Sequence, residues 1–244
     1  MFLFLGHMAV VWLFVRGKWH RVRWSNSILT MYARFGLRVL KIQVNPLGLE
    51  NLVGIENGLF VGNHLSYIDV LVFHSRLPAC FVTSMEVKRT PVLGQVCQLA
   101  GCLFVERRNK QNILNEIGEI SSGLQAGLNV AIFPEATSSN GEQILRFRRP
   151  LYVAAIDAKK PVMPFCLNYR RVGNAPINLK TRDKIFWYGD MDFVSHLWAL
   201  AGSGGVEVEI NYLAAIHPAP VDDATALAQK SQDAVEKVFL KVQA

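Results

Sequence analysis

The stretch Leu59-Phe-Val-Gly-Asn-His-Leu-Ser-Tyr-Ile-Asp-Val-Leu71 joins a short apolar run to a segment with a helical pattern. The run predicts a buried strand over Leu59–Asn63, and the pattern after it predicts a helix over Tyr67–Leu77. The turn between them contains His64, and Asp69 lies in the first turn of the predicted helix. Ligands of α/β proteins gather at the carboxyl ends of strands, so this turn is a candidate functional site.

The same alternation of apolar runs and helical segments continues along the chain. It is typical of a single α/β domain with a mostly parallel mixed sheet flanked by helices. The other predicted strands are Cys80–Ser84, Cys102–Glu106, Asn129–Phe133, Val162–Tyr169, Ile185–Tyr188 and Val206–Tyr212, and the other predicted helices are Pro91–Leu99, Lys110–Ala126 and Asp222–Val242.

The composition narrows the class of protein. The chain has 244 residues, which suits one compact domain or one domain with a small extension. Hydrophobic residues make up 51%, charged residues 18%, and the formal net charge is +7. Such a chain has two common partners, nucleic acid and an anionic membrane. Cys80, Cys97, Cys102 and Cys166 lack metal-site spacing, so we expect reduced core thiols and no bound metal.

The N-terminal part favours the membrane. Met1–Val15 is almost wholly apolar but too short for a confident transmembrane helix. Arg16–Trp24 mixes basic residues with tryptophan, a combination found at the headgroup level of cytoplasmic membrane faces. Ser25–Ile42 predicts a helix with one apolar and one basic face, which can lie in the membrane interface. A helix packed on the domain with a solvated basic face is the alternative.

These patterns divide the chain into two parts. Residues 1–42 are interpreted as membrane-associating helices. The break at Asn45-Pro-Leu-Gly48 marks the start of the catalytic domain, residues 43–244.

His64 and Asp69 are suited to base catalysis. Histidine can accept a proton near neutral pH, and a carboxylate on its other nitrogen would fix the tautomer. The structural alternative is that Ser66-x-x-Asp69 is a capping box, in which Asp69 only caps the helix.

Two further strand ends carry polar residues. After Asn129–Phe133 come Glu135, which could accept hydrogen bonds from a polyol, and Thr137, whose turn could bind an anion. The strand Cys102–Glu106 is followed by Arg107, and arginine suits bidentate phosphate binding. The alternative for Glu135 is an ordinary strand-to-loop turn with a solvated carboxylate. For Arg107 taken alone, a charged strand end in solvent is the better interpretation.

The three segments together resemble the glycerolipid acyltransferase family. That family has N-H-x-x-x-x-D, then a G-x-x-F-[IV]-x-R strand, then F-P-E-G-T and a V-x-P strand. The matching residues here are Asn63-His64 with Asp69, Gly101 with Phe104-Val105-Glu106-Arg107, Phe133-Pro134-Glu135-Ala136-Thr137, and Val162-Met163-Pro164.

The resemblance implies a mechanism and partners. His64 would take the proton of the acceptor hydroxyl, Asp69 would orient His64, and the alkoxide would attack the thioester of acyl-CoA or acyl-ACP. Arg107, Glu135 and Thr137 would bind the acceptor, a lysophospholipid such as 1-acyl-glycerol-3-phosphate. No cofactor or metal is implied. The enzyme would act on membrane lipids at the cytoplasmic face of the inner membrane.

Three departures from the family pattern bear on the acceptor. Ala136 replaces the usual glycine, Ser138 stands where glycerophosphate enzymes often have arginine, and Arg148-Arg149-Pro150 replaces a glycine-containing segment. The first two weaken the case for a phosphate headgroup at that position. The segment Thr137-Ser-Ser-Asn-Gly141 resembles the lyso-ornithine-lipid acyltransferases of the same superfamily, whose acceptor lacks a phosphate. We rank lysophosphatidic acid narrowly ahead as the acceptor, because Arg107 and nearby basic residues are present.

Three functions from other classes are alternatives to acyl transfer. A lipid-binding protein with an impaired site would explain Ala136, but His64, Asp69 and Glu135 are intact. A thioesterase or other serine hydrolase would need a G-x-S-x-G motif, which the sequence lacks. A nucleic-acid binder would explain the charge but not the apolar N-terminus, and no nucleic-acid-binding motif is present.

Overall fold

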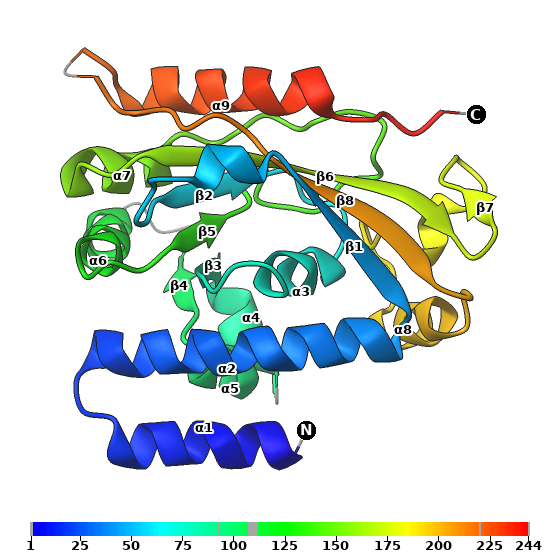
Figure 1. Ribbon diagram of the computed structural model, residues 1–244, viewed down its shortest axis with the longest axis horizontal. Coiled ribbons are helices and arrows are strands. Elements are labelled where there is room, and N and C mark those ends of the chain that lie inside the picture. Colours follow the sequence, from blue (N-terminus) through cyan, green and yellow to red (C-terminus); the bar gives the residue numbers. More distant parts are fainter. Residues whose placement is uncertain (1, 92, 107–111, 220, 244) are drawn as a thin grey trace.

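The computed structural model describes residues 2–91, 93–106, 112–219 and 221–243 (Figure 1). In these residues one mixed sheet runs in the order β1-β8-β6-β2-β5-β3-β4, with β7 paired to β6. The five strands β2 to β6 are parallel, whereas β1 and β8 run the opposite way. This confirms the predicted α/β class. The strands are β1 Ile42–Leu47, β2 Leu59–Gly62, β3 Cys80–Ser84, β4 Leu103–Val105, β5 Val130–Ile132, β6 Val162–Val172, β7 Ala175–Pro176 and β8 Val206–Tyr212.

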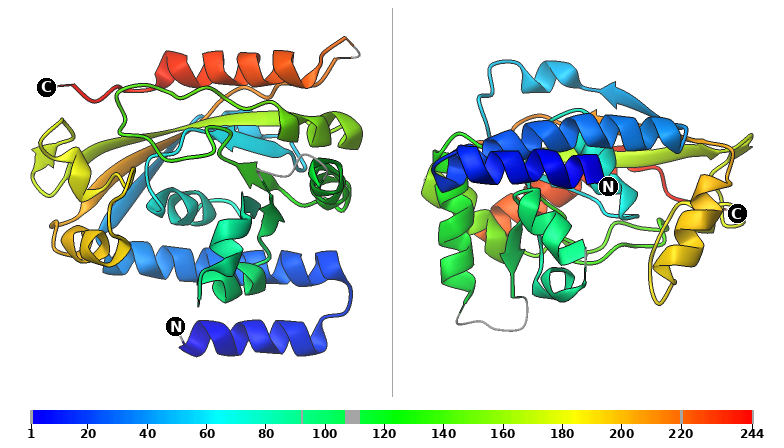
Figure 2. Two further views of the ribbon diagram at one scale, coloured as in Figure 1. Left: turned by 180° about the vertical axis from the view of Figure 1, so that it is seen from behind. Right: turned by 90° about the horizontal axis from the view of Figure 1, so that it is seen from below.

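Helices cover both faces of the sheet. Helix α9 crosses one face, while α3 lies between the other face and the N-terminal helices α1 and α2 (Figures 1 and 2). The sheet is therefore buried on both sides, as expected for parallel strands. The helices are α1 Phe2–Phe14, α2 Lys18–Val39, α3 Ile68–His74, α4 Met85–Arg89, α5 Leu93–Leu99, α6 Ile113–Gln125, α7 Val153–Ala158, α8 Phe193–Ala201 and α9 Ala224–Val238.

Strand β2 is the central strand that places the site. All four of its residues are buried, so its run of apolar residues lacks the alternation of a half-exposed strand. Gly62 is the last residue of the strand, and only glycine fits there because a Cβ would lie 2.5 Å from the Phe165 ring on β6. The chain leaves β2 towards β3 and later crosses from β5 to β6 on its other side. The carboxyl end of β2 is thus a topological switch point, the usual place for a ligand.

Helix α9 forms near the predicted C-terminal helix and packs one side against the sheet. The Asp223 carboxylate caps it by accepting a hydrogen bond of 2.8 Å from the Ala226 N–H. The helix is shorter than the predicted Asp222–Val242. It buries its apolar side against β6, through Leu227, Ala228, Ser231 and Val235.

The N-terminal helices pack on each other and on the domain. Phe4 and Met8 of α1 form a small core with Ala100, and Ala33 and Leu37 of α2 are buried. In the described residues, none of the helices combines the length and apolar character needed to cross a bilayer. Membrane association and the division at residue 42 stay predictions.

The structure corrects several predicted elements. Ile185–Tyr188 was predicted as a strand and is not one. Its backbone bonds go to a 3₁₀ turn and to the Leu65 carbonyl, which the Trp187 N–H reaches at 2.9 Å, so its buried apolar side chains belong to a covering loop. Strand β1, with Pro46 in it, and helices α4, α7 and α8 were not predicted. Helix α2 begins before the predicted Ser25 and ends at Val39. The predicted helix Lys110–Ala126 corresponds to α6, and Lys110 lies outside the described residues.

Candidate active site

Two neighbouring strands end at the same place and bring the two sharpest motifs together. Strands β2 and β5 are parallel with Val61 opposite Ile132, so the turns that follow them lie side by side. The His64 ring stacks on the Phe133 ring, with centroids 4.1 Å apart and planes 4° apart. This stacking restricts the orientation of the imidazole.

The His64 imidazole is hydrogen-bonded to Asp69. Its Nδ1 lies 2.8 Å from Asp69 Oδ2, and the Asp69 side chain is fully buried. A carboxylate accepts the bond, so Nδ1 carries the proton and Nε2 is left as the basic nitrogen. The His64 side chain is 21% exposed. The predicted dyad geometry is therefore present, and a reactant can approach the ring.

Asp69 is both a cap and a partner of the imidazole. Its Oδ2 accepts the N–H groups of Leu65 at 2.6 Å and Ser66 at 2.9 Å, as the capping-box alternative expected. Its Oδ1 accepts the Tyr169 hydroxyl at 2.6 Å. With the imidazole, four donors surround the carboxylate, as a buried charge requires. Burial, followed by the Asp69 charge, raises the pKa of Tyr169 well above its ordinary value, so the hydroxyl is a donor.

The Glu135 carboxylate is hydrogen-bonded to the backbone of the turn that carries His64. The side chain is buried, and its Oε1 accepts the His64 N–H at 3.0 Å while Oε2 accepts the Leu145 N–H at 3.2 Å. Burial raises the pKa of Glu135 to about 8, although these two N–H groups lower it. Both carboxylate oxygens are thus hydrogen-bonded within the protein. The sequence analysis expected Glu135 to accept hydrogen bonds from a polyol ligand and missed this structural role.

The turn after Glu135 is strained at Ala136, as the replaced glycine suggested. Its φ is 64°, in the left-handed region that disfavours a side chain. Ala136 N–H donates to the Phe133 carbonyl at 3.0 Å, which closes this turn.

We expect Ala136→Gly to stabilise the fold. Relief of the left-handed strain is worth roughly 1–2 kcal/mol, and the added freedom of the unfolded chain offsets roughly 0.5–1 kcal/mol of it. The free energy of unfolding in urea should rise by about 0.5–1 kcal/mol. The control is Ala199→Gly, exposed within helix α8, which should lose about 1 kcal/mol. Equal losses in both variants would show that position 136 is not strained.

The other predicted site residues are less closely tied to the dyad. Thr137 is exposed, and Ser138 donates its hydroxyl to the Trp187 carbonyl. The Ser139 N–H is occupied by the His64 carbonyl at 2.9 Å, so it is not free to bind an anion. Arg107 lies outside the described residues.

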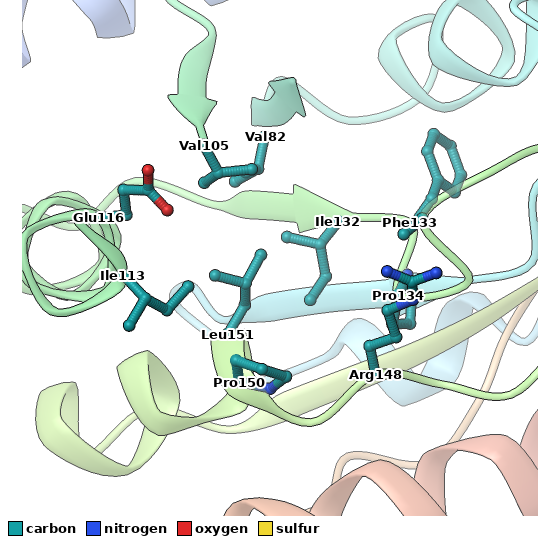
Figure 3. Close-up of a pocket in the computed structure, with 11 residues that line it drawn as sticks. Val82, Val105, Ile113, Glu116, Ile132, Phe133, Pro134, Arg148, Pro150 and Leu151 are labelled. Carbon is teal, nitrogen blue, oxygen red and sulfur yellow. The ribbon is translucent and has the colours of Figure 1, made fainter. Parts of the chain in front are cut away.

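An apolar cavity of about 130 Å³ lies beside Phe133. Figure 3 shows Phe133, Pro134 and Arg148 at one end of it and Glu116 at the other. Because Phe133 stacks on His64, the cavity starts next to the dyad. Its walls between these ends are apolar side chains of Val82, Val105, Ile113, Ile132 and Leu151.

Tyr169 is the site residue that the sequence analysis missed. It lies 100 residues from Asp69, on β6, and only the pairing of β6 with β2 brings it there. The sequence signal was weak, because Tyr169 ends an apolar run that reads as an ordinary buried strand. Within the part of the chain that the structure describes, no cluster of three or more histidine, cysteine or acidic side chains could hold a metal ion.

Comparison with known proteins gives consistent results. A protein-family model described as Acyltransferase matches residues 43–168. The chain is 29% identical over 184 residues to the 1-acyl-sn-glycerol-3-phosphate acyltransferase of Neisseria gonorrhoeae, which covers 75% of this chain and 69% of that protein. It is 26% identical over 226 residues to the lyso-ornithine lipid O-acyltransferase of Brucella abortus, covering 88% and 83%. For the lyso-ornithine lipid O-acyltransferase of Pseudomonas aeruginosa the identity is 32% over 178 residues, covering 72% and 66%.

A solved structure shares the fold. The crystal structure of a 1-acyl-sn-glycerophosphate acyltransferase from Thermotoga maritima superposes with a TM-score of 0.68 at 16% sequence identity. The match covers 96% of this chain and 86% of the other.

Proposed function

From the premise that this chain belongs to the glycerolipid acyltransferase family, we propose that it moves a fatty acyl group from a carrier thioester to the free hydroxyl of a lysolipid. The observation that carries the proposal is the hydrogen bond between His64 Nδ1 and Asp69 Oδ2, which leaves Nε2 as the basic nitrogen of a side chain that is 21% exposed. The names of the relatives support a lysolipid acceptor.

The proposed reaction needs no covalent intermediate on the protein. His64 Nε2 accepts the hydroxyl proton while the acceptor oxygen forms a bond to the thioester carbonyl carbon. The carbon–sulfur bond then breaks, and the leaving thiolate takes the proton from the imidazolium. Asp69 stabilises that imidazolium. Tyr169 holds the Asp69 carboxylate in place, and Glu135 holds the backbone N–H of His64.

The apolar cavity beside Phe133 suits the acyl chain. A thioester carbonyl next to His64 would leave its chain pointing to this end of the cavity, where the walls are apolar. Burial of each methylene from water contributes about 0.8 kcal/mol. We therefore assign the cavity to the part of the acyl chain nearest the thioester.

We propose lysophosphatidic acid as the acceptor. Arg107, in the family motif, supports it, as does the relative from Neisseria gonorrhoeae that is named 1-acyl-sn-glycerol-3-phosphate acyltransferase. A lyso-ornithine lipid is the second candidate. It is favoured by Ser138, which stands where glycerophosphate enzymes often have arginine and whose hydroxyl donates to the Trp187 carbonyl. Relatives named lyso-ornithine lipid O-acyltransferase, among them those from Brucella abortus and Pseudomonas aeruginosa, also support it.

Direct competition between the two lysolipids tests this choice. Both are offered at equal concentration to the purified enzyme with one acyl donor, and the two products are quantified by mass spectrometry. If lysophosphatidic acid is the acceptor, its kcat/KM should be higher than that of the lyso-ornithine lipid. The opposite ranking would show that Ser138 and the altered turn are the better guide.

We further propose that α1 and α2 dock the enzyme on the cytoplasmic face of the membrane, where acceptor lipids reside. Large apolar side chains are exposed along both helices, among them Leu13 at 77%, Phe14 at 78% and Phe35 at 63%. Basic residues accompany them, and helices with exposed apolar and basic side chains bind anionic interfaces.

We expect the triple variant Leu13→Ser, Phe14→Ser and Phe35→Ser to bind anionic vesicles at least about 10-fold more weakly, since full burial of each side chain contributes roughly 1.5–3 kcal/mol. Co-sedimentation with vesicles measures this. A control with Val53→Ser and Val221→Ser, which are 81% and 92% exposed outside these helices, should bind as the wild type does. Equal binding of all three proteins would contradict the assignment.

A further inference from the structure

We infer that a basic cleft beside helix α9 binds the phosphate groups of coenzyme A, the carrier of the acyl donor. The cleft is defined by Arg146, Arg148 and Arg149 on one side and by α9 on the other. This inference rests on the proposed acyl transfer and adds the donor's identity and its binding site to it.

The cleft has the size and lining of a polar ligand site. Its volume is about 680 Å³, within the range of small-molecule sites. The three arginines are exposed, and the opposite wall is formed by polar side chains of α9. Among these, Gln229 donates to Asp233 at 2.7 Å, and Gln232 accepts the Phe147 N–H at 2.9 Å, so the arginines are the groups left to bind a ligand. Arginine binds phosphate with paired hydrogen bonds in a fixed geometry, so three guanidinium groups within four residues favour a ligand with several phosphates.

The three positive charges are not neutralised within the described chain. None of them forms an ion pair with a carboxylate there, whereas Arg182 pairs with Glu142 at 2.6 Å. Among the described residues that line the cleft, Glu135 is the acidic one, and both of its oxygens accept backbone N–H groups. The cleft therefore presents an excess of positive charge suited to an anion.

The position of the cleft favours the donor over the acceptor. The cleft is built against α9, on the face of the sheet opposite the exposed helices α1 and α2 (Figures 1 and 2). If those helices contact the membrane, the cleft faces water. A lysolipid headgroup stays with its membrane-embedded chain, whereas coenzyme A is water-soluble and carries its phosphates at the end remote from the thioester.

Arg148 links the cleft to the reaction centre. It lines both the cleft and the apolar cavity beside Phe133, and its backbone N–H donates to the Pro134 carbonyl at 2.9 Å. Phosphates held in the cleft would let the pantetheine arm run past Arg148 towards Phe133. The thioester would then meet His64, which stacks on Phe133.

The double variant Arg146→Gln and Arg149→Gln tests the inference while Arg148 is retained. In the full-length enzyme we expect the KM for acyl-CoA to rise about 10- to 100-fold, because charge-assisted hydrogen bonds to phosphate are lost. The KM for the lysolipid should change less than about threefold. A matched control, Arg170→Gln with Arg171→Gln, removes two exposed arginine charges outside the cleft and should behave as the wild type does.

A binding measurement separates this inference from the reaction itself. Adenosine 3′,5′-bisphosphate, a fragment of coenzyme A without thioester, is titrated into the full chain by calorimetry. Wild type and control should bind it, and the cleft variant should bind it at least about 10-fold more weakly. A rise in the lysolipid KM instead of the donor KM would assign the cleft to the headgroup and overturn the inference. Equal fragment affinity in all proteins would also overturn it, whether or not the chain transfers acyl groups.

Discussion

His64→Ala should lower kcat at least about 100-fold, the usual contribution of a positioned general base. The variant keeps the Asp69 carboxylate and the Glu135 contact to the backbone N–H at position 64, so the turn should persist. What is lost is the Nε2 acceptor for the hydroxyl proton. The KM values for donor and acceptor should change little, because the imidazole acts in the transition state rather than in binding.

His217→Ala is the matched control for this prediction. His217 is exposed on the segment between β8 and α9, and its replacement should leave kcat at the wild-type value. Thermal unfolding of both variants, measured alongside, shows whether the fold is intact. Near-normal turnover in a folded His64→Ala enzyme would refute the role of the imidazole as base.

Asp69→Asn should lower kcat on the order of 10²–10⁴-fold while the protein stays folded. An asparagine oxygen at the Oδ2 position can still accept the backbone N–H groups of Leu65 and Ser66 and the ring Nδ1–H of His64. Its amide would occupy the Oδ1 position, where the Tyr169 hydroxyl can reverse and accept. The hydrogen bonds are thus retained and the negative charge is removed, so the loss measures how much the charge stabilises the imidazolium.

Tyr169→Phe provides the graded comparison. It removes one of the four donors to Asp69 and should cost about 10-fold in kcat, less than loss of the charge. Tyr212→Phe is matched to it, since Tyr212 is buried on the neighbouring strand β8 and its hydroxyl has no hydrogen-bond partner in the described residues. If Asp69→Asn turns over as fast as Tyr212→Phe, the carboxylate serves only as a helix cap.

The sequence was most informative where the interactions are local. The alternation of strands and helices predicted the α/β class. His64 and Asp69 are five residues apart across one turn, so their contact could be proposed from the sequence. Glu135 and Tyr169 lie 71 and 100 residues from their partners, and their contacts depend on which strands are neighbours of β2. No pattern within one segment specifies that order.

One wrong prediction and one untested prediction have a similar physical basis. Ile185–Tyr188 is apolar because it covers the site, and burial without strand pairing gives the same composition as a strand. Helix α2 has exposed apolar residues, as a membrane-contacting helix would, but it also packs on the domain through Val22 and Leu37. A sequence pattern shows that a face is apolar, and the fold decides what covers it.

Acceptor-dependent release of thiol is the most direct test of acyl transfer. The purified enzyme is mixed with acyl-CoA in detergent. Free CoA is followed with a thiol reagent, and the lipid product is identified and quantified by mass spectrometry. The account predicts that CoA appears only when the lysolipid is present and in equal amount to the acylated product. Release of CoA without a lysolipid would identify a thioesterase. No acyl transfer to either lysolipid, from acyl-CoA or in a parallel assay from acyl-ACP, would identify a lipid-binding protein. Each result would contradict the account.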